Sequence, residues 1–193
     1  MSALSRPRRS PRMRRLLFVA LVLVAFSASG ALGQASKAKP APAPNAVIAF
    51  EKGDVTLEFW PGDAPNHVKN FLDLVRKGFY DGQRVHRVEP GFVVQFGDPQ
   101  SKTLPMTDPR IGTGGPGYTI KGEFNKRPFD RGVLGMARTQ DPDSAGSQIY
   151  IMLGPAHFLN NQYTAFGRVT KGMDVVDKIK VGDRIKSIKV VQK

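Results

Sequence analysis

Short segments rich in apolar and β-branched residues, separated by Gly and Pro, dominate residues 46–193, and this pattern is typical of strands. Two of these segments, 47–50 and 55–59, flank a turn in which Gly53 supplies the positive φ that a tight reversal needs. They predict a hairpin. The further strand candidates are residues 84–88, 92–96, 132–137, 147–153, 164–169 and 185–191.

Two segments carry a helical pattern instead. Apolar residues recur at positions 68, 71, 72 and 75, which is the spacing of one helical face, with Pro65 near the start and Gly78 at the end. A second, short helix is predicted over residues 173–179. Many short strands with only two helices predict a mainly β protein, built as a closed antiparallel β-barrel.

The beginning of the chain is typical of a secretory signal. Basic residues up to Arg15 precede the apolar run Leu16–Phe26, and small residues follow as far as Gly33. We therefore expect residues 1–33 to be a signal peptide and the protein to be exported, periplasmic or secreted. The run has 11 residues, fewer than the ~20 that span a bilayer. An uncleaved inner-membrane anchor through residues 16–32 remains the alternative, and both Met1 and Met13 fit as the start.

Residues 34–45 alternate Ala and Pro and contain no apolar face to bury, as expected of an extended linker. The folded domain is therefore expected over residues 46–193. With 193 residues, 40% of them hydrophobic and 12 of them Phe, the chain has the composition of a globular protein with one core.

The net charge of +13 raises the question of a nucleic-acid partner. Residues 1–45 hold eight basic residues and no acidic ones, whereas residues 46–193 hold 21 basic and 16 acidic residues, interspersed along the chain. A mixed charge pattern of this kind is the usual solvated surface. We therefore expect no nucleic-acid partner.

Several other chemistries lack their motifs. Cysteine is absent, which excludes disulfides and thiol nucleophiles. The segment Gly112–Gly117 satisfies G-x-G-x-x-G, but it follows a Pro-rich loop and contains Pro116, so we expect a surface loop and not a phosphate cradle. His67, His86 and His157 are not spaced as zinc ligands. We expect neither a metal nor a cofactor.

One long motif resembles a known family. Residues 85–98 read Val-His-Arg-Val-Glu-Pro-Gly-Phe-Val-Val-Gln-Phe-Gly-Asp, which is similar to the cyclophilin signature F-H-R-V-x-P-G-F-x-x-Q-x-G-D. Further segments follow in the order of that family: 70–71, 78–80, 112–118, 135–138, 145–151 and 166–169. The resemblance covers essentially all of residues 46–193. It implies an eight-stranded antiparallel barrel capped by two α-helices, and a cofactor-free peptidyl-prolyl cis-trans isomerase.

Residue by residue, the resemblance implies that Arg87 is catalytic and that Gln95 is its hydrogen-bonding companion. Strand alternation turns His86 away from Arg87, so we expect His86 to pack. The residues implied in substrate binding would form a proline pocket, an adjoining groove and a rim: Phe92, Val93, Tyr150 and Leu159; Ala137, Arg138 and Gln148; Phe158 and Tyr163.

Some of these residues depart from the pattern most familiar in the family. Val93 stands where Met is usual, Tyr150 where Phe is usual, Phe158 where Trp is usual, and Tyr163 where His is usual. All four keep an apolar or aromatic wall. Arg138, in place of the usual Asn, adds a charge to the groove.

The expected partners are unfolded or flexible polypeptides that contain proline, acted on by a monomer. Stable membrane association is expected only if the N-terminal segment stays uncleaved. The main alternative is a chaperone or scaffold that binds proline at the same groove without turnover. The intact pair of Arg87 and Gln95 favours the enzyme.

Overall fold

The structure is a computed structural model that describes residues 45–191. The expected signal peptide and almost all of the expected linker lie outside the described residues. The elements in chain order are β1 (Asn45–Phe50), β2 (Gly53–Phe59), α1 (Pro65–Arg76), β3 (Arg87–Glu89), β4 (Val93–Phe96), η1 (Pro99–Lys102), β5 (Val133–Met136), β6 (Ile149–Met152), η2 (His157–Leu159), β7 (Ala165–Lys171), α2 (Met173–Val176) and β8 (Ile185–Val191).

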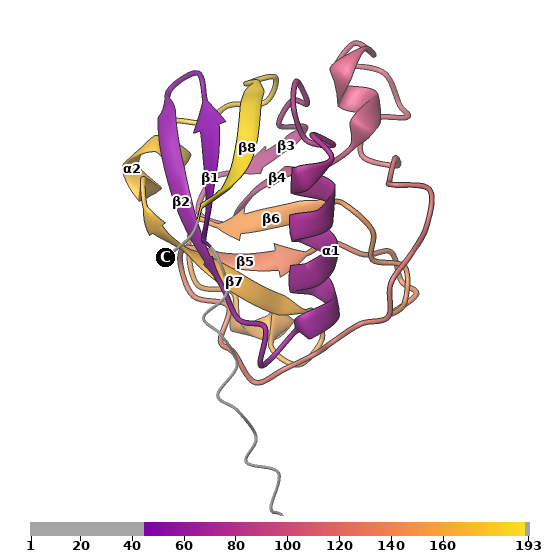
Figure 1. Ribbon diagram of the computed structural model, residues 1–193, viewed down its shortest axis with the longest axis vertical. Coiled ribbons are helices and arrows are strands. Elements are labelled where there is room, and N and C mark those ends of the chain that lie inside the picture. Colours follow the sequence, from indigo (N-terminus) through magenta and orange to yellow (C-terminus); the bar gives the residue numbers. More distant parts are fainter. Residues whose placement is uncertain (1–44, 192–193) are drawn as a thin grey trace, which may run out of the picture. The chain divides into compact units, whose positions relative to one another are not determined.

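All eight strands belong to one curled sheet, in the order β3-β4-β6-β5-β7-β2-β1-β8, and every neighbouring pair is antiparallel. The predicted hairpin of β1 and β2 is confirmed, with Phe50 opposite Gly53 at its turn. Figure 1 shows α1 on one side of this sheet and the short α2 beside β2.

The expectation of a closed barrel is wrong, because the sheet is open between its edge strands β3 and β8. A single bridge joins Arg84 to Arg184 there, and the N–H of Val85 donates to the carbonyl of Asp183 at 2.9 Å. The bonds that flank this bridge come from the N–H of Ile185 to the carbonyl of Gln83 at 2.8 Å and from that of Val85, so the N–H of Arg84 points away from β8 and donates to Ser101 Oγ at 3.0 Å. β3 begins only at Arg87, and no longer ladder forms across the gap.

The larger of two apolar clusters joins one face of the sheet to α1. Phe71 of α1 is fully buried, and its ring lies 5.5 Å from that of Phe59, 5.8 Å from that of Phe166 and 5.2 Å from that of Tyr80, measured between centroids. Complete burial of one such side chain stabilises the fold by ~1.5–3 kcal/mol. This aromatic group therefore fixes α1 on the sheet.

A smaller apolar cluster lies on the opposite face of the central strands. In β6, Ile149 and Ile151 contribute to the larger cluster, whereas Tyr150 and Met152 contribute to the smaller one. Successive side chains of a strand point to opposite faces, so a strand buried on both faces is apolar throughout. This explains the unbroken apolar run of β6, and it leaves Tyr150 free to belong to a site.

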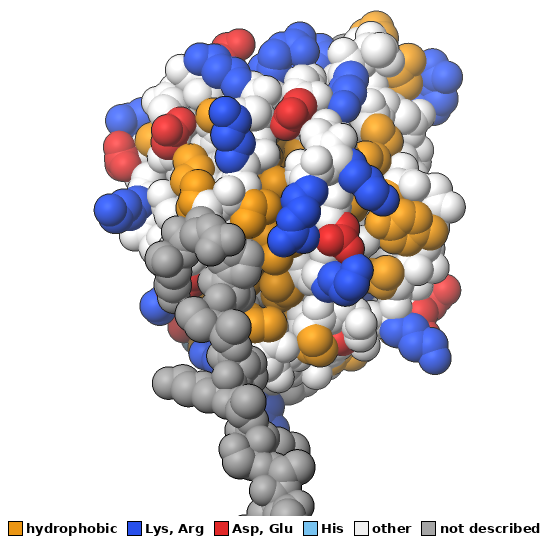
Figure 2. All heavy atoms as spheres, viewed as in Figure 1, with side chains coloured by type: hydrophobic (Ala, Val, Ile, Leu, Met, Phe, Trp, Pro, Cys, Tyr) orange, Lys and Arg blue, Asp and Glu red, His pale blue; other side chains and the backbone are white. Residues whose placement is uncertain are grey.

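The predicted elements agree with the structure except at their ends. Residues 84–88 form a strand only from Arg87 on, and the predicted helix 173–179 ends at Val176. None of the helices among residues 45–191 is both long and apolar enough to cross a membrane. Figure 2 shows basic and acidic side chains intermixed over the face seen in Figure 1, as the interspersed charges of the sequence predict.

Candidate active site

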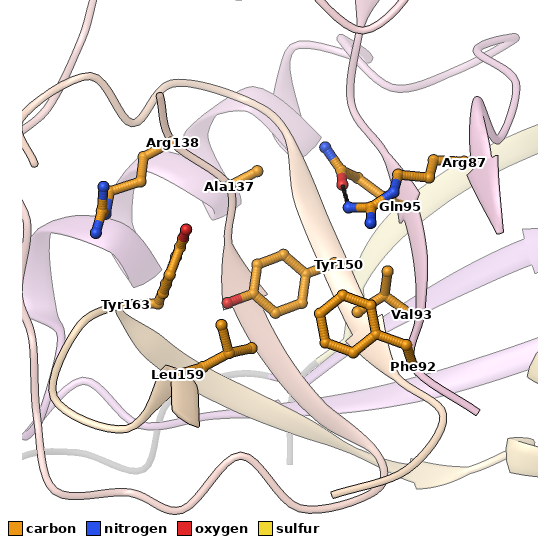
Figure 3. A pocket seen from close by; sticks show the side chains of 9 residues that line it. All are labelled: Arg87, Phe92, Val93, Gln95, Ala137, Arg138, Tyr150, Leu159 and Tyr163. Atoms are coloured by element: carbon orange, nitrogen blue, oxygen red, sulfur yellow. Dashed lines mark hydrogen bonds between the residues drawn. The ribbon is translucent and has the colours of Figure 1, made fainter. Parts of the chain in front are cut away.

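The candidate catalytic residues lie opposite each other on adjacent strands. Arg87 of β3 is the register partner of Gln95 of β4, and Gln95 is in turn the register partner of Tyr150 of β6. Arg87 Nη1 donates a hydrogen bond to Gln95 Oε1 at 3.3 Å (Figure 3). Sheet pairing therefore brings the predicted catalytic pair together beside the predicted pocket.

Gln148 holds Gln95 in this orientation. Gln95 Nε2 donates to Gln148 Oε1 at 3.0 Å, and Gln148 Nε2 donates to the carbonyls of Gly112 and Gly114 at 2.8 Å each. The two amides thus form a chain from the 112–114 loop to Arg87. Because each amide has a partner at both ends, Gln95 presents its oxygen to the guanidinium.

Only some of the N–H groups of Arg87 have a hydrogen-bond partner within the described residues. Its Nε lies 3.5 Å from Glu89 Oε1, at the limit of a hydrogen bond, and its guanidinium carbon lies 5.6 Å from the centre of the Phe92 ring. The side chain is 45% exposed. A guanidinium has five N–H groups, so Arg87 retains donors for a ligand at the mouth of the pocket.

A cavity of about 190 Å³ opens beside Arg87 (Figure 3). It brings together nine of the eleven predicted site residues: Arg87, Phe92, Val93, Gln95, Ala137, Arg138, Tyr150, Leu159 and Tyr163. The two others, Gln148 and Phe158, do not line it. Gln148 lines the adjoining cavity and accepts from Gln95, and Phe158 is 68% exposed with its ring stacked on Phe92 at 5.8 Å.

Tyr150 forms much of the cavity wall. Its ring lies over Gly135, where an added Cβ would come within 2.1 Å of the ring, so no other residue fits there without a shift. Phe129 stacks on Tyr150 at 6.0 Å, and Tyr163 meets it edge-on at 6.3 Å. The Tyr150 hydroxyl is buried and has no hydrogen-bond partner. Burial raises its pKa well above the ordinary value, and it stays protonated.

Arg138 lies at the other side of the cavity. Its Nη1 donates to the carbonyl of Thr139 at 2.7 Å, and its Nη2 donates to the carbonyl of Gln162 at 3.0 Å. The guanidinium carbon lies 4.3 Å from the centre of the Tyr163 ring and 5.6 Å from that of Phe124. These contacts fix a positive charge in the groove.

A second cavity of about 380 Å³ adjoins the first, and Gln95, Ala137 and Arg138 line both. Gln148, which was predicted for an adjoining groove together with Ala137 and Arg138, also lines this second cavity. The sequence did not single out its other polar lining residues: Thr113, Tyr118, Thr119, Thr139 and Ser144.

The segment 112–117 is confirmed as a surface loop, with Gly112 and Gly117 at φ of 91° and 89°. The N–H groups of Gly112 and Gly114 donate to Asp98 Oδ2 at 2.5 and 3.3 Å. With these donors occupied, the segment offers no cradle for a phosphate. Asp98 instead ties the loop to the end of β4.

The histidines give no sign of ligand chemistry. Both ring nitrogens of His86 are buried without a partner, and burial lowers the pKa of this side chain. His86 is therefore neutral at pH 7 and packs beside Gly112, where an added Cβ would lie 3.7 Å from its ring. Among residues 45–191, no three His, Asp or Glu side chains are grouped as metal ligands.

The fold and the site define a protein with a small pocket, walled by aromatic and aliphatic side chains, next to an oriented guanidinium. Comparison with known proteins identifies the family to which the chain belongs. Residues 46–193 match the family described as cyclophilin type peptidyl-prolyl cis-trans isomerase/CLD. The chain therefore belongs to the cyclophilin-type peptidyl-prolyl cis-trans isomerase family, and it is an enzyme of that type.

Individual relatives of this chain carry the name of the same family. A probable peptidyl-prolyl cis-trans isomerase of Brucella abortus is 46% identical over 171 residues, which cover 87% of this chain and 86% of the relative. A crystal structure of a cyclophilin type peptidyl-prolyl cis-trans isomerase from Cryptosporidium parvum, 26% identical, has a TM-score of 0.69 and covers 78% of this chain and 99% of that one. A second structure of the Cryptosporidium protein, obtained in the presence of the dipeptide Ala-Pro, has a TM-score of 0.67 and 27% identity, covering 77% of this chain and 99% of that one.

Proposed function

We propose that this protein accelerates the rotation of X–Pro bonds in unfolded or newly exported polypeptides, with the proline ring in the cavity beside Tyr150. The observation that carries the proposal is the chain from Gln148 through Gln95 to Arg87 at the mouth of an apolar pocket. This chain orients the Arg87 guanidinium so that it can donate to a bound X–Pro amide as the amide rotates. The Ala-Pro dipeptide used with the Cryptosporidium relative fits the same chemistry.

The pocket contributes by removing water from the amide. Rotation has to break amide conjugation, a barrier of ~18–20 kcal/mol. The planar amide carries separated charge that water stabilises, so apolar walls such as Phe92, Val93 and Leu159 weaken the planar state relative to the twisted one. No covalent bond to the protein is needed, and no cofactor enters the step.

The arginine contributes when the bond twists. As conjugation is lost, the imide nitrogen regains a lone pair, which can accept a hydrogen bond from Arg87. This bond strengthens only in the transition state, and such differential interactions raise the rate. Arg suits the role because it stays charged and presents a rigid fork, which Gln95 orients at 3.3 Å.

The magnitude is reasonable for these groups. Shortening an isomerisation of tens of seconds to about a millisecond is ~10⁴-fold, or ~5.4 kcal/mol. One charge-assisted hydrogen bond contributes ~1.5–3 kcal/mol. Desolvation and positioning in the pocket then supply the remainder.

Replacement of Arg87 by Ala tests the mechanism. The transition-state hydrogen bond and the charge are lost together, so we expect kcat/KM for a proline tetrapeptide to fall at least ~100-fold, or ~2.7 kcal/mol. The fold should persist, because the side chain is 45% exposed. Arg87→Lys should restore only part of the rate, since a flexible point charge lacks the fork.

Arg76→Ala is the matched control, because Arg76 lies on the outer face of α1 and pairs only with Asp73. It should leave the rate unchanged. A folded Arg87→Ala protein that turns over peptides near the original rate would show that the pocket alone carries the reaction. Wild-type protein that binds proline peptides without accelerating them would establish the chaperone or scaffold instead.

A further inference from the structure

Arg138 lacks the carboxylate partner that several other arginines of the described residues have. Arg127, Arg131 and Arg168 each pair with a carboxylate at 2.7 Å. Arg138 has no such partner among the described residues, and the acceptors of its N–H groups are the main-chain carbonyls of residues 139, 140 and 162. Its positive charge is therefore not neutralised within the part of the chain that the structure describes.

The guanidinium is also held in place. Tyr163 stacks at 4.3 Å and Phe124 lies at 5.6 Å, while the carbonyl of Gln162 accepts from both Nε and Nη2. A side chain already fixed in this way loses little conformational entropy when a ligand meets it. Arg138 is thus preorganised as a charged contact.

Its position is the junction of the two cavities, since Arg138 lines both. Neither cavity is lined by an acidic residue, and Arg87 is the second cation in the first cavity. Asp141 and Asp143 follow in the next turn, but they line neither cavity. They accept instead from the N–H groups of Asp143 and Gly122. The groove therefore presents positive charge and neutral donors to a bound peptide.

We propose that Arg138 is a specificity-determining residue that favours an Asp or Glu side chain close to the isomerised proline. With the proline ring in the first cavity, a neighbouring residue of an extended chain lies over the second cavity. An acidic side chain there meets the positive charge of Arg138, while the hydroxyl of Thr139 donates to that of Ser144, which donates to the carbonyl of Asp141. A lysine at the same position meets an unmatched like charge. This inference rests on the proposed function.

Charge-variant peptides test the proposal. Tetra- to hexapeptides with a single Glu, Gln or Lys, scanned over the three positions on each side of X–Pro, are compared by kcat/KM. We expect at least one position at which Glu exceeds Lys roughly fivefold, with Gln between them, as a partly exposed ion pair allows. The ratio should fall towards one as NaCl is raised, because salt screens such a pair.

Variants assign the preference to its residue. Arg138→Gln should reduce the ratio of Glu to Lys turnover to below about twofold, and Arg138→Lys should keep part of it. Arg76→Gln removes an arginine from the surface of α1 and should leave the ratio unchanged. The ratio is measured within one protein, so a general loss of activity in a variant cancels.

The outcomes separate the two proposals. Wild-type protein that turns over all peptides with a ratio near one, or an Arg138→Gln protein that keeps the wild-type ratio, overturns the role of Arg138 and leaves the isomerase intact. Wild-type protein that accelerates none of the peptides overturns the proposed function itself. If the Arg138 variants fold poorly, the salt series on wild-type protein still tests the proposal, because a preference that is independent of salt is not electrostatic and overturns it.

Discussion

Two buried tyrosines show how much the same hydroxyl depends on its surroundings. Tyr80 is fully buried and donates to the carbonyl of Ser147 at 3.0 Å. Tyr150 is 5% exposed, and its buried oxygen has no partner. A buried hydroxyl without a hydrogen bond costs ~1–3 kcal/mol of stability. The ring of Tyr150 lines the pocket, whereas its unpartnered hydroxyl lowers the free energy of unfolding.

Tyr150→Phe should therefore stabilise the protein. Removal of the unpartnered hydroxyl is expected to raise the free energy of unfolding by about 1 kcal/mol, while prolyl isomerisation continues because the aromatic wall remains. Denaturant unfolding and a peptide assay on the same samples measure both effects. Tyr80→Phe, the same chemical change at a partnered hydroxyl, should lower the free energy of unfolding by about 1 kcal/mol. Equal losses in both variants would contradict the argument.

The individual site residues were predictable to different degrees. Arg87 and Gln95 followed from a signature within one 14-residue segment, and the strand register places them opposite each other. The roles of Gly112 and Gly114 as acceptors for Gln148 could not be predicted, because 34 and 36 residues separate these partners along the chain. Contacts between loops leave no periodic pattern in a sequence.

At the scale of elements, α1 begins with a cap that comes from a distant loop. Its first turn contains no acidic residue, and no side chain of the N-cap residue accepts from the helix. Instead, Glu123 accepts from the N–H of Asn66 at 3.1 Å, from the N–H of His67 at 2.9 Å and from His67 Nδ1 at 2.7 Å. A carboxylate at a helix N-terminus accepts hydrogen bonds from the free N–H groups, and its negative charge interacts favourably with the positive end of the helix dipole.

This cap makes stability depend on pH. Burial lowers the pKa of His67 despite the opposing effect of Glu123, so the folded state holds the imidazole neutral. Burial alone would raise the pKa of the Glu123 carboxyl, but its hydrogen bonds from His67 and Asn66 hold it below the ordinary value. Both shifts have the same sign: the unfolded chain binds protons at a higher pH than the folded one.

We therefore expect the free energy of unfolding to fall as the pH drops below about 6.5, the unfolded pKa of His, and further below about 4.3, where Glu123 begins to be protonated in the unfolded chain. The slope due to His67 reaches at most about 1.4 kcal/mol per pH unit. Urea unfolding between pH 7.5 and 4 measures it. His67→Asn should lower stability overall and remove part of the upper dependence, while His86, whose pKa burial also lowers, retains the rest.

The elements themselves were largely readable from the sequence, and their assembly less so. The β1–β2 hairpin, α1 and β8 lie close to their predicted residues because their apolar patterns are local and regular. Closure of the sheet was predicted wrongly. Residues 82–85, which precede β3, meet residues 182–185 through backbone hydrogen bonds, yet only one bridge forms between them. No pattern within either segment reveals how far such pairing extends.

At the scale of the molecule, one sheet serves the core and the site at once. Along β4, Val94 and Phe96 belong to the larger apolar cluster, while Val93 belongs to the smaller one and Gln95 lines the pocket. Val93, Gln95 and Tyr150 are therefore carried by strands packed on both faces, whereas Arg87 lies on the edge strand β3 and the other residues that line the cavity lie outside the strands. Strands packed on both faces fix the positions of their side chains more firmly than loops do. This suits the proposed reaction, which depends on the direction of one hydrogen bond.

The last prediction concerns where this molecule works, and it rests on residues outside the described part of the chain. Six arginines precede the apolar run 16–26, small residues follow to Gly33, and an Ala/Pro segment then leads to the folded domain. This order is typical of an export signal followed by a spacer. We propose that the domain is released outside the cytoplasm, where newly arrived chains contain incorrect proline isomers.

N-terminal sequencing of the protein recovered from fractionated cells should begin between residues 31 and 35, and the protein should be in the soluble exported fraction. An intact terminus at Met1 or Met13 in the membrane fraction would instead establish the anchor. In that case the isomerase would act within reach of the membrane, because a linker of 12 residues extends at most ~43 Å.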